Sequence, residues 1–178
     1  NLLTVHCPNT GSMKNCQVEG SECWYSLSDN PKRKLQGTLE IVTTSHGQLA
    51  GINTLNANRL VANALECKII PELASYDTVS KEVRYGSEKS RIDFFLQDSA
   101  NHLPDCYVEV KSVTLREGNQ GYFPDSVSVR ASKHLAELQR IVEDGGRAML
   151  IYCVQHTGIH SVAAAKHIDP NYAAALKA

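Results

Sequence analysis

The chain has 178 residues, of which 42% are hydrophobic and 21% are charged, and its formal net charge is −1. This is the composition of an ordinary globular protein of one large or two small domains. It excludes a collagen-like chain, a low-complexity chain and a globally basic nucleic-acid binder. No stretch approaches the roughly 20 apolar residues that a membrane-spanning helix needs, so we expect no membrane partner. The oligomeric state is not indicated.

Six cysteines are present, and none of them forms a Cys-x-x-Cys pair. Cys106 and Cys153 lie in apolar runs, which is typical of small core residues. The nearest group of metal-like side chains has spacings that match no common zinc pattern: His6, Cys7, Cys16 and Cys23. Reduced structural thiols are therefore favoured over a zinc site, and they indicate a cytoplasmic protein.

Short strand-like segments separated by glycines follow one another over residues 1–50. They are "LLTVHC", "SECWYSLS", "GTLEIVTT" and "QLAGIN", in which β-forming residues alternate or cluster. The pattern predicts a small antiparallel β-unit of the kind found in small barrels. Within it, Lys32, Arg33 and Lys34 follow the turn-like "SDNP". This basic cluster is either a solvated loop or a local contact to DNA phosphates, and we carry the second interpretation as a hypothesis.

The pattern changes after residue 50, and we place a second domain at residues 51–178. "NANRLVANALECKII" has helical spacing, with Asn53 or Thr54 as its cap and Pro71 as its end. Three strand-like segments follow, "SKEVRYG", "SRIDFFLQ" and "DCYVEVKSVTL", with a turn at residues 86–88 between the first two.

A strongly amphipathic helix is predicted over residues 127–144. Asp125 or Ser126 is expected to cap its start, and Gly145 and Gly146 are expected to end it. The next segment, "RAMLIYCV", is apolar on both faces, which is typical of a central buried strand. The second domain is therefore expected to run helix, three strands, helix, strand.

Charged residues alternate with apolar ones in the three strands of the second domain. Because successive side chains on a strand point to opposite faces, Asp93 is expected opposite Ile92 and its apolar neighbours. Glu109 and Lys111 are expected on the polar face of the third strand, and Glu82 on that of the first. If these strands are neighbours, the four charged groups meet on one surface.

Two carboxylates at close range repel each other, and a divalent cation removes that repulsion. Mg²⁺ or Mn²⁺ takes oxygen ligands, typically one or two carboxylates together with water and substrate phosphate. We therefore assign Asp93 and Glu109 as candidate ligands, the carbonyl of Val110 as a third and Glu82 as an outer-sphere ligand. Lys111 would orient an attacking water or stabilise charge on the phosphorus. The alternative, cross-strand ion pairs on a solvated face, stays open.

Three polar residues near the start of the long helix share one face because they are spaced i, i+3 and i+4: Arg130, Lys133 and His134. They fit either a phosphate contact beside the acidic group or an ordinary solvated face. Tyr122 and Phe123, in the preceding segment, fit either base stacking or packing over the sheet edge. Residues 9–11 fit a turn better than a ligand loop.

The Asp…Glu-x-Lys arrangement within this order of elements resembles the PD-(D/E)xK nuclease superfamily. More narrowly, the chain resembles the sugar fermentation stimulation protein A family in long blocks that span nearly the whole sequence. Among them are "HCPNTGSM", "WYSLSDNPKRK", "EVRYGSEKSRIDF", "DCYVEVKSVTL", "GYFPDSVSVRASKHL" and "KHIDPNY". The resemblance implies an α/β protein with an OB-like small β-barrel unit at residues 1–50. A restriction-endonuclease-like domain with a mixed central sheet would follow at residues 51–178. Family members extend beyond both ends, so we expect a fragment, in agreement with a start at Asn1.

The resemblance also implies DNA binding and a regulatory link to the use of sugars such as maltose. By position, Asp93, Glu109 and Lys111 take the superfamily's metal and catalytic places. Two positions depart from the pattern: Ile92 replaces the proline before the aspartate, and Ser132 stands where the family often has glutamine. The expected activity is metal-dependent hydrolysis of DNA phosphodiesters. The alternatives are a DNA-binding regulator that keeps the scaffold without cleavage, and a sugar-binding regulator.

Overall fold

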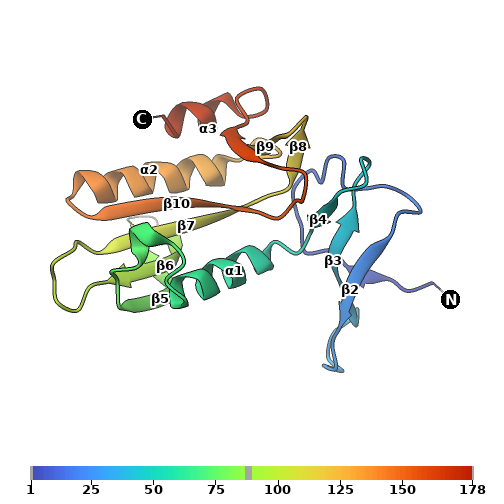
Figure 1. Ribbon diagram of the computed structural model, residues 1–178, viewed down its shortest axis with the longest axis horizontal. Helices are drawn as coiled ribbons and strands as arrows, with labels where there is room; N and C mark the ends of the chain where they lie inside the picture. The colour runs from blue at the N-terminus through green and yellow to red at the C-terminus, as the bar shows by residue number, and fades with distance from the viewer. Residues whose placement is uncertain (1, 87–89, 178) are drawn as a thin grey trace.

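The computed structural model describes residues 2–86 and 90–177. Figure 1 shows a small β-unit at one end of the molecule, which contains β1 to β4, and a larger α/β unit that contains the remaining elements. Helix α1 connects the two units.

The β-unit is built around its longest strand, β3 (Gly37–Thr43). β2 (Cys23–Leu27) and β4 (Leu49–Gly51) pair with β3 in antiparallel fashion, whereas β1 (Val5–His6) pairs with it in parallel. The four strands fall within the predicted segments, but the expectation of a wholly antiparallel unit is wrong for β1. Buried side chains form a small core: Cys16, Val42, Ala50 and Ile52.

Helix α1 (Leu55–Glu66) buries one stripe of side chains spaced by four residues: Ala57, Val61 and Leu65. The N-cap is Thr54, one of the two predicted residues, but its side chain makes no capping hydrogen bond. The side-chain oxygen of Asn53, the other predicted residue, accepts a hydrogen bond from the N–H of Leu55 at 3.2 Å. The helix ends earlier than predicted, because Lys68 leaves helical geometry with a φ of 54°. Pro71 begins a separate 3-10 helix, η1 (Pro71–Leu73).

Helix α2 (Val129–Glu143) is the predicted amphipathic helix. Its cap is Ser128, whose hydroxyl accepts a hydrogen bond from the N–H of Ala131 at 3.1 Å, so Asp125 and Ser126 were wrong choices. The helix ends where predicted, since Gly145 adopts a φ of 88° that suits glycine.

The main sheet has the strand order β10-β7-β6-β5. β5 (Thr78–Tyr85), β6 (Ser90–Gln97) and β7 (Cys106–Val113) are antiparallel neighbours, and β10 (Arg147–Val154) joins β7 in parallel, so the sheet is mixed. The predicted central position of β10 is wrong, because β10 lies at the end of this order. Its apolar side chains are covered by helices on both faces, which explains the apolar run. The turn predicted at residues 86–88 lies partly outside the described residues.

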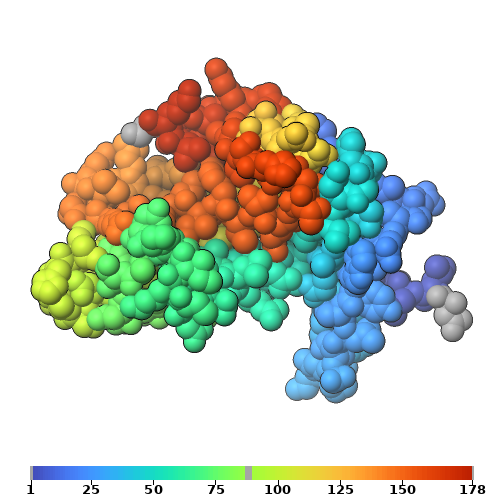
Figure 2. Space-filling view, viewed as in Figure 1, coloured from blue at the N-terminus to red at the C-terminus, as the bar shows by residue number. Residues whose placement is uncertain are grey.

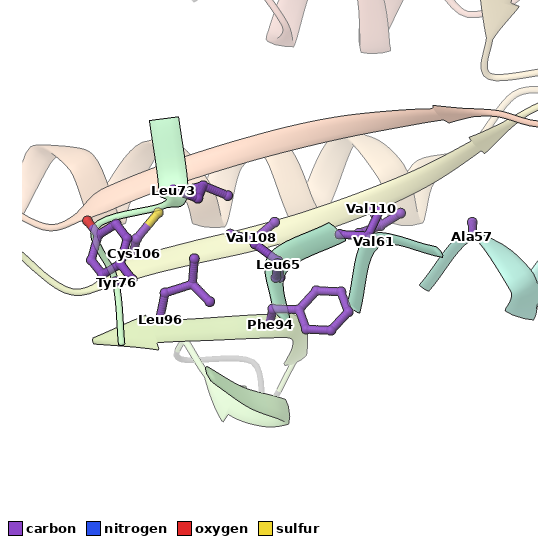
Figure 3. Close-up of a cluster of buried hydrophobic side chains, with 10 residues drawn as sticks. All are labelled: Ala57, Val61, Leu65, Leu73, Tyr76, Phe94, Leu96, Cys106, Val108 and Val110. Atoms are coloured by element: carbon purple, nitrogen blue, oxygen red, sulfur yellow. The ribbon is translucent and has the colours of Figure 1, made fainter. Parts of the chain in front are cut away.

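The two faces of the main sheet carry separate cores. On one face, five buried side chains of β6 and β7 pack with α1 (Figure 3): Phe94, Leu96, Cys106, Val108 and Val110. On the other face, Ile92 packs with Tyr85 and with Leu138 of α2. The prediction that Ile92 shares the face of Phe94 and Leu96 is therefore wrong, and the alternation of β6 is interrupted at Asp93.

A third sheet and a short helix follow β7, and periodicity did not predict them because each element is short. β8 (Leu115–Glu117), β9 (Gln120–Phe123) and β11 (Ser161–Ala164) have the order β11-β9-β8. Helix α3 (Pro170–Ala175) packs on α2 through Tyr172. Across residues 2–86 and 90–177, no helix combines the length and the apolar character that a membrane crossing requires.

Candidate metal centre

Asp93 lies where β6 and β7 separate. The two strands pair through their backbones from Phe94 to Leu96. At Asp93, the side chain rather than the backbone bonds to the neighbouring strand. Its Oδ2 accepts a hydrogen bond from the N–H of Val110 at 2.7 Å, and its Oδ1 accepts one from the side-chain amide of Asn58 on α1 at 2.7 Å. The carboxylate is therefore held between the two strands and the helix.

Glu109 lies on β7 and is only 3% exposed. Its Oε1 accepts a hydrogen bond from Nζ of Lys111 at 2.5 Å and lies 2.6 Å from Nδ1 of His134 on α2. Its Oε2 is buried and has no hydrogen-bond partner among the described residues. A buried acceptor without a partner is costly, so this oxygen marks a place where a ligand would stabilise the protein.

The two carboxylates differ in their electrostatic surroundings. Burial, and then the negative charge of Glu109, raises the pKa of Asp93. Burial alone would raise the pKa of Glu109 as well, but the hydrogen bond from His134 and the charge of Lys111 outweigh it and lower that pKa. Glu109 is thus held ionised, and a cation that binds both groups would remove the repulsion that acts on Asp93.

A cavity of about 360 Å³ opens beside these carboxylates. The starts of α1 and α2 border it, and so do the segment between β9 and α2 and residues 9–11 of the β-unit. Helix N-termini favour anions, and Lys111 and Arg130 add two positive groups to the lining. The cavity thus combines ligands for a cation with a surface that suits a phosphate.

Four of the five metal and catalytic positions predicted from the sequence line this cavity: Asp93, Glu109, Val110 and Lys111. Glu82 does not. It is exposed, has a φ of 54° and falls where the pairing of β5 with β6 is interrupted. Tyr85, further along the same strand, is buried, and its burial and then the charge of Glu109 raise the pKa of its phenol. The expectation that Glu82 shares the acidic surface is corrected accordingly.

The residues predicted to contact DNA are spread over the molecule. Arg130 lines the cavity, and Lys133 is exposed on the same helix. His134 is 5% exposed and contacts Glu109, so it lies on no solvated face, and its ring contacts a carboxylate where a phosphate contact was predicted. The basic cluster lies outside the cavity lining, on the hairpin between β2 and β3 that projects from the body of the molecule (Figure 2). There, Arg33 donates a hydrogen bond to the hydroxyl of Thr38 at 2.7 Å.

Three further residues at the cavity are Tyr122, Phe123 and Asn58. Tyr122 and Phe123 both line the cavity, but Phe123 is held by ring contacts with Tyr152 and Tyr172, as expected for packing. Asn58 was missed, because an asparagine on a helix has no pattern that marks a contact with a strand 35 positions away.

A divalent cation fits this set of side chains. Across residues 2–86 and 90–177, no three side chains among His, Cys, Asp and Glu come together as a metal site. Asp93 and Glu109 would therefore be the two carboxylate ligands, and the remaining ligands would be backbone, water and phosphate oxygens. This division is typical of Mg²⁺ bound together with a phosphate substrate. The buried, unpartnered Oε2 of Glu109 is the observation that favours a cation at this place.

The architecture and the cavity together define the class of protein: a two-unit α/β protein whose acidic, lysine-containing cavity is bordered by both units. The family model described as "SfsA N-terminal OB domain" matches residues 1–52. The model described as "Sugar fermentation stimulation protein RE domain" matches residues 55–178. The chain belongs to the sugar fermentation stimulation protein family, and its fold is a mixed α/β fold with an N-terminal OB domain.

Curated relatives carry the same description, "Sugar fermentation stimulation protein homolog". The relative from Shewanella woodyi is 55% identical over 177 residues, which cover 98% of this chain and 74% of the relative. The relative from Saccharophagus degradans is 57% identical over 176 residues, with the same coverage of 98% and 74%. A solved structure, Pyrococcus furiosus SfsA in complex with Ca²⁺, is 28% identical with a TM-score of 0.85. The match covers 97% of this chain and 71% of that one.

Proposed function

We propose that this protein binds DNA and hydrolyses its phosphodiester bonds with the help of a divalent cation at Asp93 and Glu109. The observation that carries the proposal is the buried Oε2 of Glu109, which lacks a partner in the described residues. Glu109 lines a cavity that Lys111 and Arg130 also line. The Ca²⁺ in the related Pyrococcus furiosus structure supports a cation in this family.

The side chains would divide the work as follows. Asp93 and Glu109 would hold Mg²⁺ or Mn²⁺, with the carbonyl of Val110 as a candidate third ligand. Such a cation would supply charge stabilisation at a phosphoryl oxygen and a more acidic water. Lys111, whose ammonium contacts Glu109, lines the cavity where it can orient a water or stabilise negative charge on the phosphoryl group. Arg130 would bind a non-bridging phosphate oxygen.

Contacts away from the cavity would position the DNA without reading its sequence. Lys32, Arg33 and Lys34 on the projecting hairpin and Lys133 on α2 are the candidates. A role in regulating sugar use, such as that of maltose, would then follow from DNA binding. The same binding without hydrolysis is the rival proposal.

Hydrolysis assays with matched variants test the proposal. Wild-type protein, Glu109→Ala and Glu66→Ala are incubated with supercoiled plasmid or linear single-stranded DNA in Mg²⁺, Mn²⁺ or EDTA. Glu66 is an exposed glutamate at the end of α1 and serves as the matched control. We expect hydrolysis of at least one of the two substrates by wild type and Glu66→Ala with either cation, and none of either substrate with EDTA or with Glu109→Ala.

The outcomes separate the two proposals. DNA retention without hydrolysis under every condition would favour the non-enzymatic regulator. Hydrolysis that persists in Glu109→Ala would show that the activity does not depend on this site, and an absence of DNA binding would contradict both proposals.

A further inference from the structure

One wall of the cavity comes from the β-unit and is fixed to the larger unit. Asp125, in the segment before α2, receives hydrogen bonds at a single oxygen, Oδ2. The N–H of Ser12 donates at 2.8 Å, the hydroxyl of Ser12 at 3.2 Å and the N–H of Met13 at 3.4 Å. Gly11 passes so close to this carboxylate that a Cβ atom there would collide with it. Residues 9–11 are therefore held against the cavity.

Further contacts fasten the same segment on both sides. Nζ of Lys14 lies 2.7 Å from Oε1 of Glu117 on β8, and the side-chain amide of Asn15 donates to the carbonyl of Arg116 at 3.3 Å. On the other side, the hydroxyl of Thr54 donates to the carbonyl of Pro8 at 3.5 Å. The wall is thus attached to the start of α1, to β8 and to the segment before α2.

Asp93, Glu109 and Lys111 line the same cavity as this wall. Glu109 is 3% exposed, and the cavity volume of about 360 Å³ is at the lower end of the range for small-molecule sites. A duplex presents each phosphodiester together with a paired strand, and even its major groove is about 12 Å wide. A cavity of this size accommodates about one nucleotide of one strand, and the paired strand of a duplex would have to lie outside it.

We propose that the cavity selects single-stranded DNA, or a frayed duplex end, and that the pinned wall at residues 9–11 excludes continuous duplex. This proposal rests on the proposed function and names its substrate class. The polar lining supplies contacts that are independent of sequence, from Asn9, Thr10, Ser126, Ser128 and Arg130. Tyr122, which also lines the cavity, offers an aromatic ring for base stacking.

Binding is measured first, in Glu109→Gln protein without a divalent cation, so that the result does not depend on hydrolysis. Fluorescence anisotropy compares a short labelled single strand, the same sequence as a blunt duplex, and a duplex with a single-stranded overhang, all at one fixed salt concentration. We expect the single strand and the overhang to bind about tenfold more tightly than the blunt duplex. Equal or tighter binding of the blunt duplex would overturn the proposal.

The wall is then tested with variants that release or displace it. Asp125→Ala removes the acceptor that fixes Ser12 and Met13, and Gly11→Ala forces the wall away from Asp125. We expect both variants to reduce the preference for single strands several-fold by admitting duplex. Asp29→Ala, in the exposed hairpin loop, should keep the wild-type preference. Thermal unfolding confirms that each variant is folded.

Failure of this inference differs from failure of the proposed function. A preference for single strands without hydrolysis in any cation would contradict the proposed enzymatic activity and support the proposed selectivity. Cation-dependent hydrolysis of blunt duplex at the same rate as single strands would support the proposed enzymatic activity and contradict the proposed selectivity. A preference that is unchanged in both folded wall variants would show that residues 9–11 do not select the strand.

Discussion

Nδ1 of His134 lies 2.6 Å from Oε1 of Glu109, and Nε of Arg130 lies 3.5 Å from Nε2 of the same imidazole. An arginine donates at its Nε, so Nε2 of His134 is the acceptor and Nδ1 carries the hydrogen that Glu109 accepts. The imidazole therefore connects an arginine of the cavity lining to a buried carboxylate. His134 acts on Glu109 as a positioning residue, in the manner of groups that orient metal ligands.

Replacing His134 tests this relationship. His134→Leu leaves Glu109 with Lys111 as its remaining donor in the contacts described, so we expect a loss of about 1–3 kcal/mol in the free energy of unfolding. We also expect cation affinity to fall about 10- to 100-fold. Urea denaturation and calorimetric titration with Mn²⁺ measure the two effects.

His134→Asn provides the matched comparison, since the asparagine amide can place a donor near the position of Nδ1. It should recover much of the cation affinity that His134→Leu loses. Equal cation affinity in both variants would show that the hydrogen bond to Glu109 does not orient the ligand.

A cation should stabilise the folded protein through Asp93. Binding to the native state alone raises the free energy of unfolding by about 2.7 kcal/mol when the free cation is at 100 times its Kd. We expect Mg²⁺, Mn²⁺ or Ca²⁺ to raise the Tm of the wild type and of Asp29→Asn, and to leave that of Asp93→Asn unchanged. Differential scanning fluorimetry with and without EDTA measures this. A cation-induced rise in Asp93→Asn would place the binding site elsewhere.

Glu40 should make the fold sensitive to acid. Ser26 donates to its Oε1 at 2.6 Å, and Asn53 and Asn56 donate to its Oε2 at 2.9 and 3.0 Å. Burial alone would raise the pKa of Glu40, but these hydrogen bonds and the charge of Arg59 lower it below its ordinary value of 4.5. The folded state thus favours the ionised carboxylate.

A lowered pKa in the folded state gives stability that is present above pH 4.5 and is lost as the pH falls through the lower, folded pKa. Glu40→Gln removes this dependence, so the wild type should lose more stability than the variant between neutral and acidic pH. The difference should be on the order of 1 kcal/mol or less, because Glu40 is partly exposed. Urea denaturation at both pH values measures it, and parallel losses in the two proteins would contradict the assignment.

Tyr172 should stabilise the attachment of α3. Its side chain is fully buried, and its hydroxyl lies 2.7 Å from that of Tyr152. Tyr172→Phe leaves the Tyr152 hydroxyl without this partner, so we expect a loss of about 1–2 kcal/mol in the free energy of unfolding. Tyr25→Phe, at an exposed position on β2, is the control and should change stability little. Similar values for the two variants would show that the buried hydroxyl pair contributes nothing.

The sequence predicted the regular part of the main sheet well. Alternation along β7 predicted that Glu109 lies on the face opposite the apolar side chains, and in the structure Val108 and Val110 pack with α1 whereas Glu109 contacts α2. Alternation failed at Glu82 and Ile92. Glu82 has a positive φ and pairs with no residue of β6, and Ile92 is the neighbour of Asp93, which pairs with no residue of β5. A period of two describes a regular strand, and it cannot locate an irregularity that tertiary contacts impose.

The position of residues 9–11 beside the site could not be predicted from the sequence, for a different reason. Ser12 and Asp125 are 113 positions apart, and nothing local in either segment marks their contact. The turn predicted at residues 9–11 described the segment itself but not the surface that it covers. The position of β10 in the sheet was predicted wrongly for a related reason. An apolar run indicates that both faces of a strand are covered, but it does not indicate where the strand lies in the order of the sheet.

Two asparagines on α1 face different halves of the protein. Asn56 donates to Glu40 of the β-unit, and Asn58 donates to Asp93 of the main sheet. Together with the pinned segment at residues 9–11, they make the halves interdependent rather than modular. Residues 51–178 alone would keep both acidic groups but would lack residues 9–11, which line one side of the cavity.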